Sequence, residues 1–85
     1  MQENLSGQLA RQLRLDAIQT GRVARFDGSV GVGELVVDTA PPLAIFFQVV
    51  SVADGSRSIE VGARVAFRLG LAPTGVFEAI DIVKI

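Results

Sequence analysis

The sequence predicts a small all-β barrel built from five short strands, and three observations support this prediction. From Gly21 onward, apolar residues recur at every second position, which is the spacing of a strand with one buried face. Clusters of Gly, Pro, Asp and Ser separate these runs at regular intervals, as turns between strands do. No long helical segments alternate with the strands, as a parallel α/β sheet would require.

Length and composition indicate one globular domain. The 85 residues are 49% hydrophobic and 20% charged, a balance far from that of disordered chains. No apolar run approaches the roughly 20 residues of a membrane helix. The first residues lack the basic and apolar regions of a signal peptide. We therefore expect a cytoplasmic protein that does not associate with a membrane.

The sequence contains neither cysteine nor histidine. Their absence removes the thiolate and imidazole metal ligands, the thiol nucleophile and the commonest general base. The best acid–base candidates are carboxylates, and nothing in the sequence places any two of them together. These candidates are Glu34, Asp38, Glu78 and Asp81. We expect no enzymatic activity, no cofactor and no metal site.

Residues 1–20 are predicted to form an N-terminal extension, and residues 21–85 the barrel domain. Leu5, Leu9 and Leu13 recur at a spacing of four, which predicts an amphipathic helix. Two interpretations stay open. The extension is a marginal helix or flexible tail beside the barrel, or it is a helix that pairs with a partner chain through its leucine stripe.

The strands and turns follow in order along residues 21–85. The first strand ends at Asp27-Gly28, a dipeptide typical of tight turns. The loop 38–42 contains two prolines, which are excluded from a central strand. A polar loop at 53–58 and a turn at 72–75 separate the remaining strands. The predicted strands are residues 22–26, 32–37, 43–50, 61–69 and 76–85.

The alternation within each strand predicts which side chains face the core. In the second strand, Leu35 and Val37 are expected to point inward. The last strand has apolar residues at both parities, so we expect a bend or bulge in it. The fourth strand has the cleanest alternation, and its predicted inward residues are Val61, Ala63, Val65, Phe67 and Leu69.

Five strands of this length are typical of the OB-fold, a partly open five-stranded Greek-key barrel. An SH3-like barrel is the alternative, because strand length and order alone do not separate the two folds. We adopt the OB-fold as the prediction for residues 21–85.

Several segments resemble one family in order and spacing. Gly21-Arg22-Val23-Ala24-Arg25-Phe26-Asp27 is similar to the Gly-x-Val-x-Trp-Phe-Asn/Asp opening of cold-shock domains. Gly31-Val32-Gly33-Glu34-Leu35 and Ile45-Phe46-Phe47-Gln48-Val49 lie where that family has its two ribonucleoprotein-type motifs. Residues 57–67 and 75–79 resemble its later segments. The whole of 21–85 thus resembles a cold-shock domain, of a divergent bacterial branch.

The resemblance implies an OB-fold that binds single-stranded RNA or DNA without catalysis and with little sequence preference. Such domains stack bases on outward aromatic side chains beside a basic groove. Phe46 is kept here, whereas Arg25 replaces a Trp, and Val32 and Glu34 replace two Phe. Each lost platform removes about 1–3 kcal/mol per base, so we expect weak binding. The predicted contact residues are Arg25, Phe26, Val32, Phe46, Gln48, Arg57 and Phe77.

Charge and apolar patterning support an alternative function. The net charge of −1 lacks the basic excess that is usual in nucleic-acid-binding proteins. An outward apolar face is predicted on the second and third strands, and such faces mark interaction sites. Its members are Val32, Val36, Phe46 and Val50. The alternative is a protein-interaction or self-associating module, with a homodimer or protein partner contacting this face or the N-terminal segment.

Overall fold

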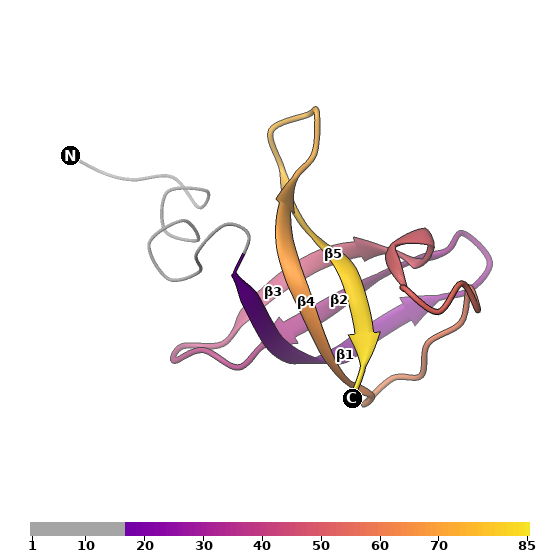
Figure 1. Cartoon of the computed structure of the whole chain (residues 1–85), viewed down its shortest axis with the longest axis horizontal. Coiled ribbons are helices and arrows are strands. Elements are labelled where there is room, and N and C mark those ends of the chain that lie inside the picture. The colour runs from indigo at the N-terminus through magenta and orange to yellow at the C-terminus, as the bar shows by residue number, and fades with distance from the viewer. Residues whose placement is uncertain (1–16) are drawn as a thin grey trace.

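Five strands close into a single barrel in a computed structural model that describes residues 17–85 (Figure 1). The order around the barrel is β1-β2-β3-β5-β4. A short 3₁₀ helix, η1, follows β3 and spans Val49–Ser51. The strands are β1 (Ile18–Asp27), β2 (Val32–Val37), β3 (Leu43–Gln48), β4 (Arg64–Leu71) and β5 (Phe77–Lys84).

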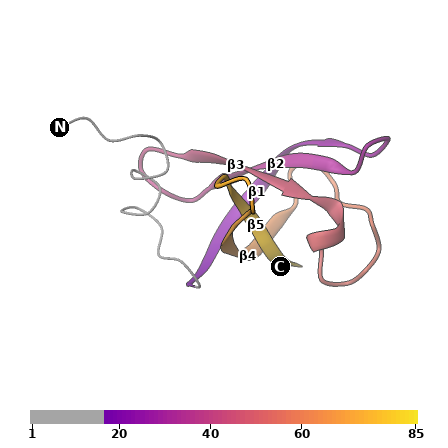
Figure 2. The same cartoon turned by 90° about the horizontal axis from the view of Figure 1, so that it is seen from above.

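The strand order confirms the predicted all-β, five-stranded OB-like barrel. Neighbouring strands are antiparallel except for β3 and β5, which pair in parallel and close the barrel. β1 belongs to both halves, because its first part pairs with β4 and its second part with β2. Figures 1 and 2 show β4 and β5 crossing over the layer formed by β1, β2 and β3.

The core fills the space between these two layers with apolar side chains from every strand. The alternation predicted for the second strand is confirmed, since Leu35 and Val37 are fully buried. Phe47 and Phe67 are the largest buried side chains and come from opposite layers. Among the described residues, no polar or charged side chain is buried. The domain is therefore held together mainly by burial of apolar surface.

Two irregularities in the strand pairing set the direction of nearby side chains. Between Val23 and Arg25, β1 advances two residues while β2 advances one, which places a bulge at Ala24. In β5 the register with β4 also shifts, and Asp81 there has a positive φ of 51°. Ala79 and Ile82 are consequently both buried although they are three residues apart. The predicted bulge in the last strand is confirmed.

Several predicted strand boundaries are wrong, and the fourth strand also runs two residues further than predicted, to Leu71. β1 begins at Ile18, so residues 18–20 belong to the barrel and not to the extension. The rest of the segment for which a helix is predicted, residues 1–16, lies outside the described part of the chain. β3 ends at Gln48, because η1 begins at Val49.

The fourth strand begins at Arg64 and not at Val61, whose side chain is 64% exposed. The backbone turns there, because the N–H of Ala63 donates to the carbonyl of Glu60. Gly62 has a φ of 92°, a conformation that side chains other than glycine rarely adopt. The inward direction predicted for Val65, Phe67 and Leu69 is confirmed; Ala63 is half-buried against the core.

Candidate nucleic-acid interface

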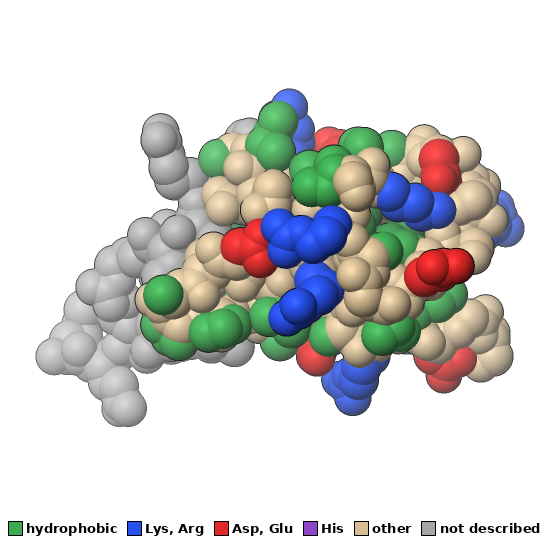
Figure 3. All heavy atoms as spheres, turned by 90° about the horizontal axis from the view of Figure 1, so that it is seen from below, with side chains coloured by type: hydrophobic (Ala, Val, Ile, Leu, Met, Phe, Trp, Pro, Cys, Tyr) green, Lys and Arg blue, Asp and Glu red, His purple; other side chains and the backbone are tan. Residues whose placement is uncertain are grey.

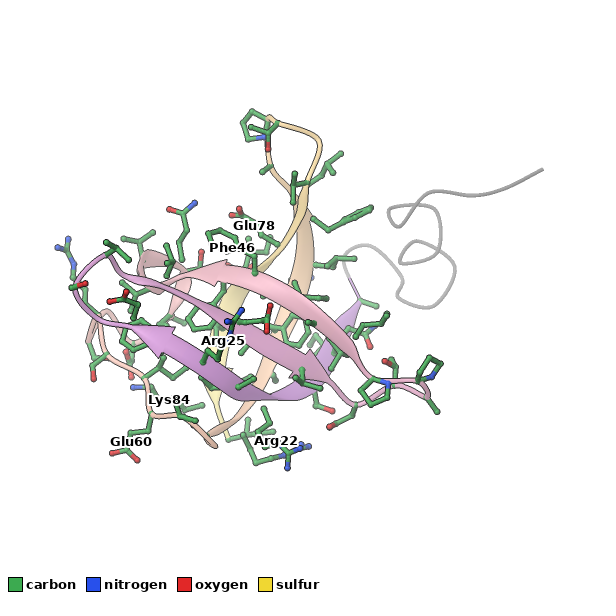
Figure 4. All side chains as sticks on the ribbon, turned by 180° about the vertical axis from the view of Figure 1, so that it is seen from behind. Arg22, Arg25, Phe46, Glu60, Glu78 and Lys84 are labelled. Carbon is green, nitrogen blue, oxygen red and sulfur yellow. The ribbon has the colours of Figure 1, made fainter. Side chains whose placement is uncertain are left out.

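The outer surface of β1, β2 and β3 carries the residues that the sequence singled out. The register places Arg25 opposite Glu34, and Glu34 opposite Phe46. Phe46 in turn pairs with Glu78 on β5. Figure 4 shows Phe46 and Glu78 near one edge of this layer, with Arg25 on its outer side. One row across four strands therefore carries three charged side chains and a single aromatic ring, which lies between the two glutamates.

A hollow of about 410 Å³ lies on this surface. In OB-folds in general, the face around strands 2 and 3 binds oligonucleotides and oligosaccharides. Phe46 forms part of its wall and is 40% exposed. The lining residues are Arg25, Phe26, Asp27, Val32, Gly33, Glu34 and Phe46.

Gly33 makes the floor of the hollow possible. A Cβ at this position would lie 2.4 Å from the carbonyl oxygen of Arg25 and 2.6 Å from the Phe47 ring. Without that Cβ, the ring of Phe47 fits beneath Gly33 and stacks on Phe26. The two ring centroids are 6.1 Å apart and the ring planes differ by 11°. The hollow thus rests on a pair of packed aromatic rings.

The bulge at Ala24 explains why Arg25 is exposed at the hollow whereas the next residue, Phe26, packs partly against the core. Arg25 points outward, opposite Glu34, and its side chain is 76% exposed. Phe26 is half-buried and packs against the core while also lining the hollow. A regular strand would have continued the alternation from Val23 and turned Arg25 toward the core.

The charges around the hollow are mixed. Nη2 of Arg25 lies 3.3 Å from Oε2 of Glu34, which forms an exposed ion pair. Asp27 accepts hydrogen bonds from the hydroxyl and the backbone N–H of Ser29, at 2.6 and 3.0 Å. These bonds lower the pKa of Asp27, so its carboxylate is ionised at neutral pH. Two carboxylates and one guanidinium therefore line the hollow.

The structure brings four of the seven predicted contact residues to the hollow, namely Arg25, Phe26, Val32 and Phe46. Gln48 lies beside it, because it is exposed and pairs with Val32 across β2 and β3.

The other two predicted residues do not line it. Arg57 is exposed in the loop before β4 and has a positive φ of 56°. Phe77 is half-buried at the start of β5 and packs against the core.

Three lining residues were not among the predicted contacts: Asp27, Gly33 and Glu34. Strand parity does place Glu34 outward, and its position opposite Phe46 follows once β2 and β3 are paired in register. Asp27 was recognised only as a turn residue. Asp27 lines the hollow because of the bulge in β1, and no sequence pattern predicts that bulge.

The predicted outward apolar face is present only in part. Val32, Val36 and Phe46 lie on the outer side of β2 and β3, with the two valines half-buried. Val50 is 69% exposed but belongs to η1 rather than to a strand. The apolar surface of the two strands is thus smaller than predicted and is interrupted by Glu34.

Comparison with known proteins assigns no family to this chain. No protein-family model matches the sequence, and no curated protein matches it.

The described residues contain no group of three or more Asp, Glu, His or Cys placed to hold a metal ion. No helix within 17–85 is long and apolar enough to cross a membrane.

Proposed function

We propose that the chain is a divergent cold-shock-like domain that binds single-stranded RNA or DNA weakly and with little sequence preference. The observation that carries the proposal is the hollow on the outer face of β1–β3, where the exposed ring of Phe46 lies near the Arg25 guanidinium. The proposal involves no catalytic step and no cofactor.

Stacking on Phe46 supplies the main attraction. Stacking of a base on an aromatic side chain contributes about 1–3 kcal/mol and is tolerant of sequence, because every base has a π-face. Phe26 offers a smaller surface, since one face of its ring is stacked on Phe47 and the side chain is half-buried. Gln48 adds an amide beside the hollow that can donate to or accept from a base.

Electrostatics keeps this binding weak. Arg25 can pair with phosphate, but Glu34 already neutralises it, and Asp27 lies in the same hollow. The hollow is lined by one guanidinium and two carboxylates, so it offers no broad patch of positive charge to a phosphate backbone. On the lower face of the barrel, shown in Figure 3, basic and acidic side chains are likewise mixed. We therefore expect a shallow salt dependence, because each neutralised phosphate contributes a slope of only about −0.7 for single strands.

The test is an anisotropy titration with a labelled, pyrimidine-rich single-stranded oligonucleotide at low and moderate salt. Phe46→Ala should weaken binding by at least about fivefold, the lower end of what one lost stacking contact implies. Val61→Ala is the matched control, because Val61 is exposed next to Glu60 (Figure 4), away from the hollow. Equal affinities of the two variants would refute stacking on Phe46.

The carboxylates beside Phe46 favour a second candidate, a protein-interaction module that has lost nucleic-acid binding. Glu34 and Glu78 are the cross-strand neighbours of Phe46 on its two sides. An aromatic face with carboxylates on both sides suits a lysine or arginine of a basic peptide, through cation–π attraction and ion pairing. An arginine-rich peptide and the oligonucleotide should therefore respond in opposite directions to Glu34→Gln.

A further inference from the structure

A second hollow, of about 350 Å³, lies on the other outer face of the barrel, across the start of β1, β4 and β5. It shares no residue with the hollow around Phe46. Figure 1 shows the beginning of β1 on the side of β4 that faces away from β5. The lining residues are Ile18, Ala66, Phe67, Arg68, Asp81 and Val83.

This hollow exposes apolar side chains that the barrel itself does not cover. Ile18 is 66% exposed and Val83 is 49% exposed. Ala66 belongs to β4, the strand between β1 and β5, and it pairs with Val83 on β5 and with Thr20, two residues from Ile18, on β1. An ion pair between Arg68 and Asp81, 3.9 Å apart, forms part of the same lining. An apolar strip with a charged edge results.

The segment that precedes β1 joins the barrel at this strip. Residues 1–16 lie outside the described part and connect through Ala17 to Ile18, which is a wall of the hollow. Leu5, Leu9 and Leu13 in this segment are spaced by four. If the segment is helical, this spacing places the three leucines along one face. Three leucines thus precede, in the sequence, an apolar strip that no side chain of residues 17–85 covers fully.

We infer that residues 5–13 dock through this leucine stripe onto the strip formed by Ile18, Ala66 and Val83 of the same chain. A nine-residue helix is about 13.5 Å long, and residues 14–17 span up to about 13 Å when extended. The segment therefore reaches the strip without strain. A short tether raises its effective concentration to the millimolar range, which favours this docking over association with a second copy.

The inference can be tested by nuclear magnetic resonance on the full-length chain. Docking gives nuclear Overhauser contacts between the methyl groups of Leu9 or Leu13 and those of Ile18 or Val83. Leu9→Gln shifts the amide signals of Ile18, Ala66 and Val83, and leaves the signal of Phe46 in place. Arg11→Gln is the control, because Arg11 lies on the opposite side of such a helix from the leucine stripe.

Two further outcomes decide the question. In a mixture of isotope-labelled and unlabelled chains, contacts that appear only between different chains would show a second copy on the strip and overturn the intramolecular inference. Unshifted Ile18, Ala66 and Val83 signals in Leu9→Gln would also overturn it, leaving the strip for a different protein. Neither outcome bears on oligonucleotide binding, because the two hollows lie on different faces.

Discussion

Phe26 stacks on Phe47 with ring centroids 6.1 Å apart, so one ring at the barrel end rests on one in the core. Phe47 is fully buried, and Phe26 is half-buried and faces the hollow. The candidate interface is therefore continuous with the hydrophobic core. Changes in the core beneath it should alter both stability and binding.

Phe47→Ala tests this continuity. Removing a fully buried phenylalanine deletes its transfer free energy and leaves a cavity, which should lower the free energy of unfolding by about 3–5 kcal/mol. Urea denaturation followed by circular dichroism measures the change. The exposed Val61→Ala should stay within about 0.5 kcal/mol of the parent chain. A loss below about 1 kcal/mol for Phe47→Ala would contradict the packing described for this ring.

Gly33→Ala should destabilise the barrel through crowding. Its Cβ would meet the Arg25 carbonyl at 2.4 Å and the Phe47 ring at 2.6 Å, and the backbone contact has little freedom to move. We expect a cost of about 1–3 kcal/mol, the usual range for overpacking. Gly28→Ala is the matched control, because its Cβ would lie 3.5 Å from the Phe26 ring, an ordinary contact. Similar unfolding midpoints for the two variants would be inconsistent with this geometry.

Asp38 should make stability depend on acid pH. Hydrogen bonds from Arg64 and then Thr20 lower the pKa of Asp38 from 3.8 to about 2. Nη1 and Nη2 of Arg64 lie 3.0 and 2.5 Å from the two carboxylate oxygens. Because the folded-state pKa is depressed, this contribution is fully present above pH 3.8 and is lost as the pH falls toward 2.

Asp38→Asn should therefore flatten the fall in melting temperature between pH 4 and pH 2, compared with the parent chain. Part of the fall should remain, because hydrogen bonds from Ser56 and then Lys84 also lower the pKa of Asp54 to about 2. Arg64→Gln should flatten the same interval, since Arg64 is the main cause of the shift. An unchanged pH profile in both variants would argue against this ion pair in solution.

Glu34→Gln should strengthen oligonucleotide binding if the face binds nucleic acid. The substitution frees Arg25 from its exposed ion pair, a change of roughly two- to fivefold in affinity for pairs of this kind. Glu60→Gln changes the net charge equally, and Glu60 lies away from Arg25 and Phe46 (Figure 4). Anisotropy titrations of both variants separate the local effect from the general one. Equal gains would mean that only net charge matters.

Strand parity was sufficient to predict the fold class and most of the core. It identified Leu35, Val65 and Phe67 as buried, because alternation directly reports which face of a strand is apolar. It failed at Val61, where the turn closed by Ala63 and Glu60 interrupts a pattern that looks regular in sequence. The end of the third strand and the start of the fourth were missed because backbone conformation, and not hydrophobicity, sets them.

The candidate site was only partly predictable, for a related reason. Arg25 and Phe46 could be selected from sequence, but their proximity depends on a bulge and on pairing between distant strands. Phe77 illustrates the limit, because an aromatic residue near a turn looks available until the structure packs it against the core. The second hollow arises from Ile18, Ala66 and Val83, which are far apart in sequence and have no motif in common.

The position of β5 between β3 and β4 has a kinetic consequence. The last strand in the chain supplies the two pairs, Phe46 with Glu78 and Phe47 with Ala79, that join the two halves of the barrel. Closure also requires Ile18 to meet Arg68 across most of the domain. Such long-range contacts slow folding. Because the barrel cannot close without β5, we expect a ribosome-bound chain to become resistant to proteases only after β5 has left the exit tunnel.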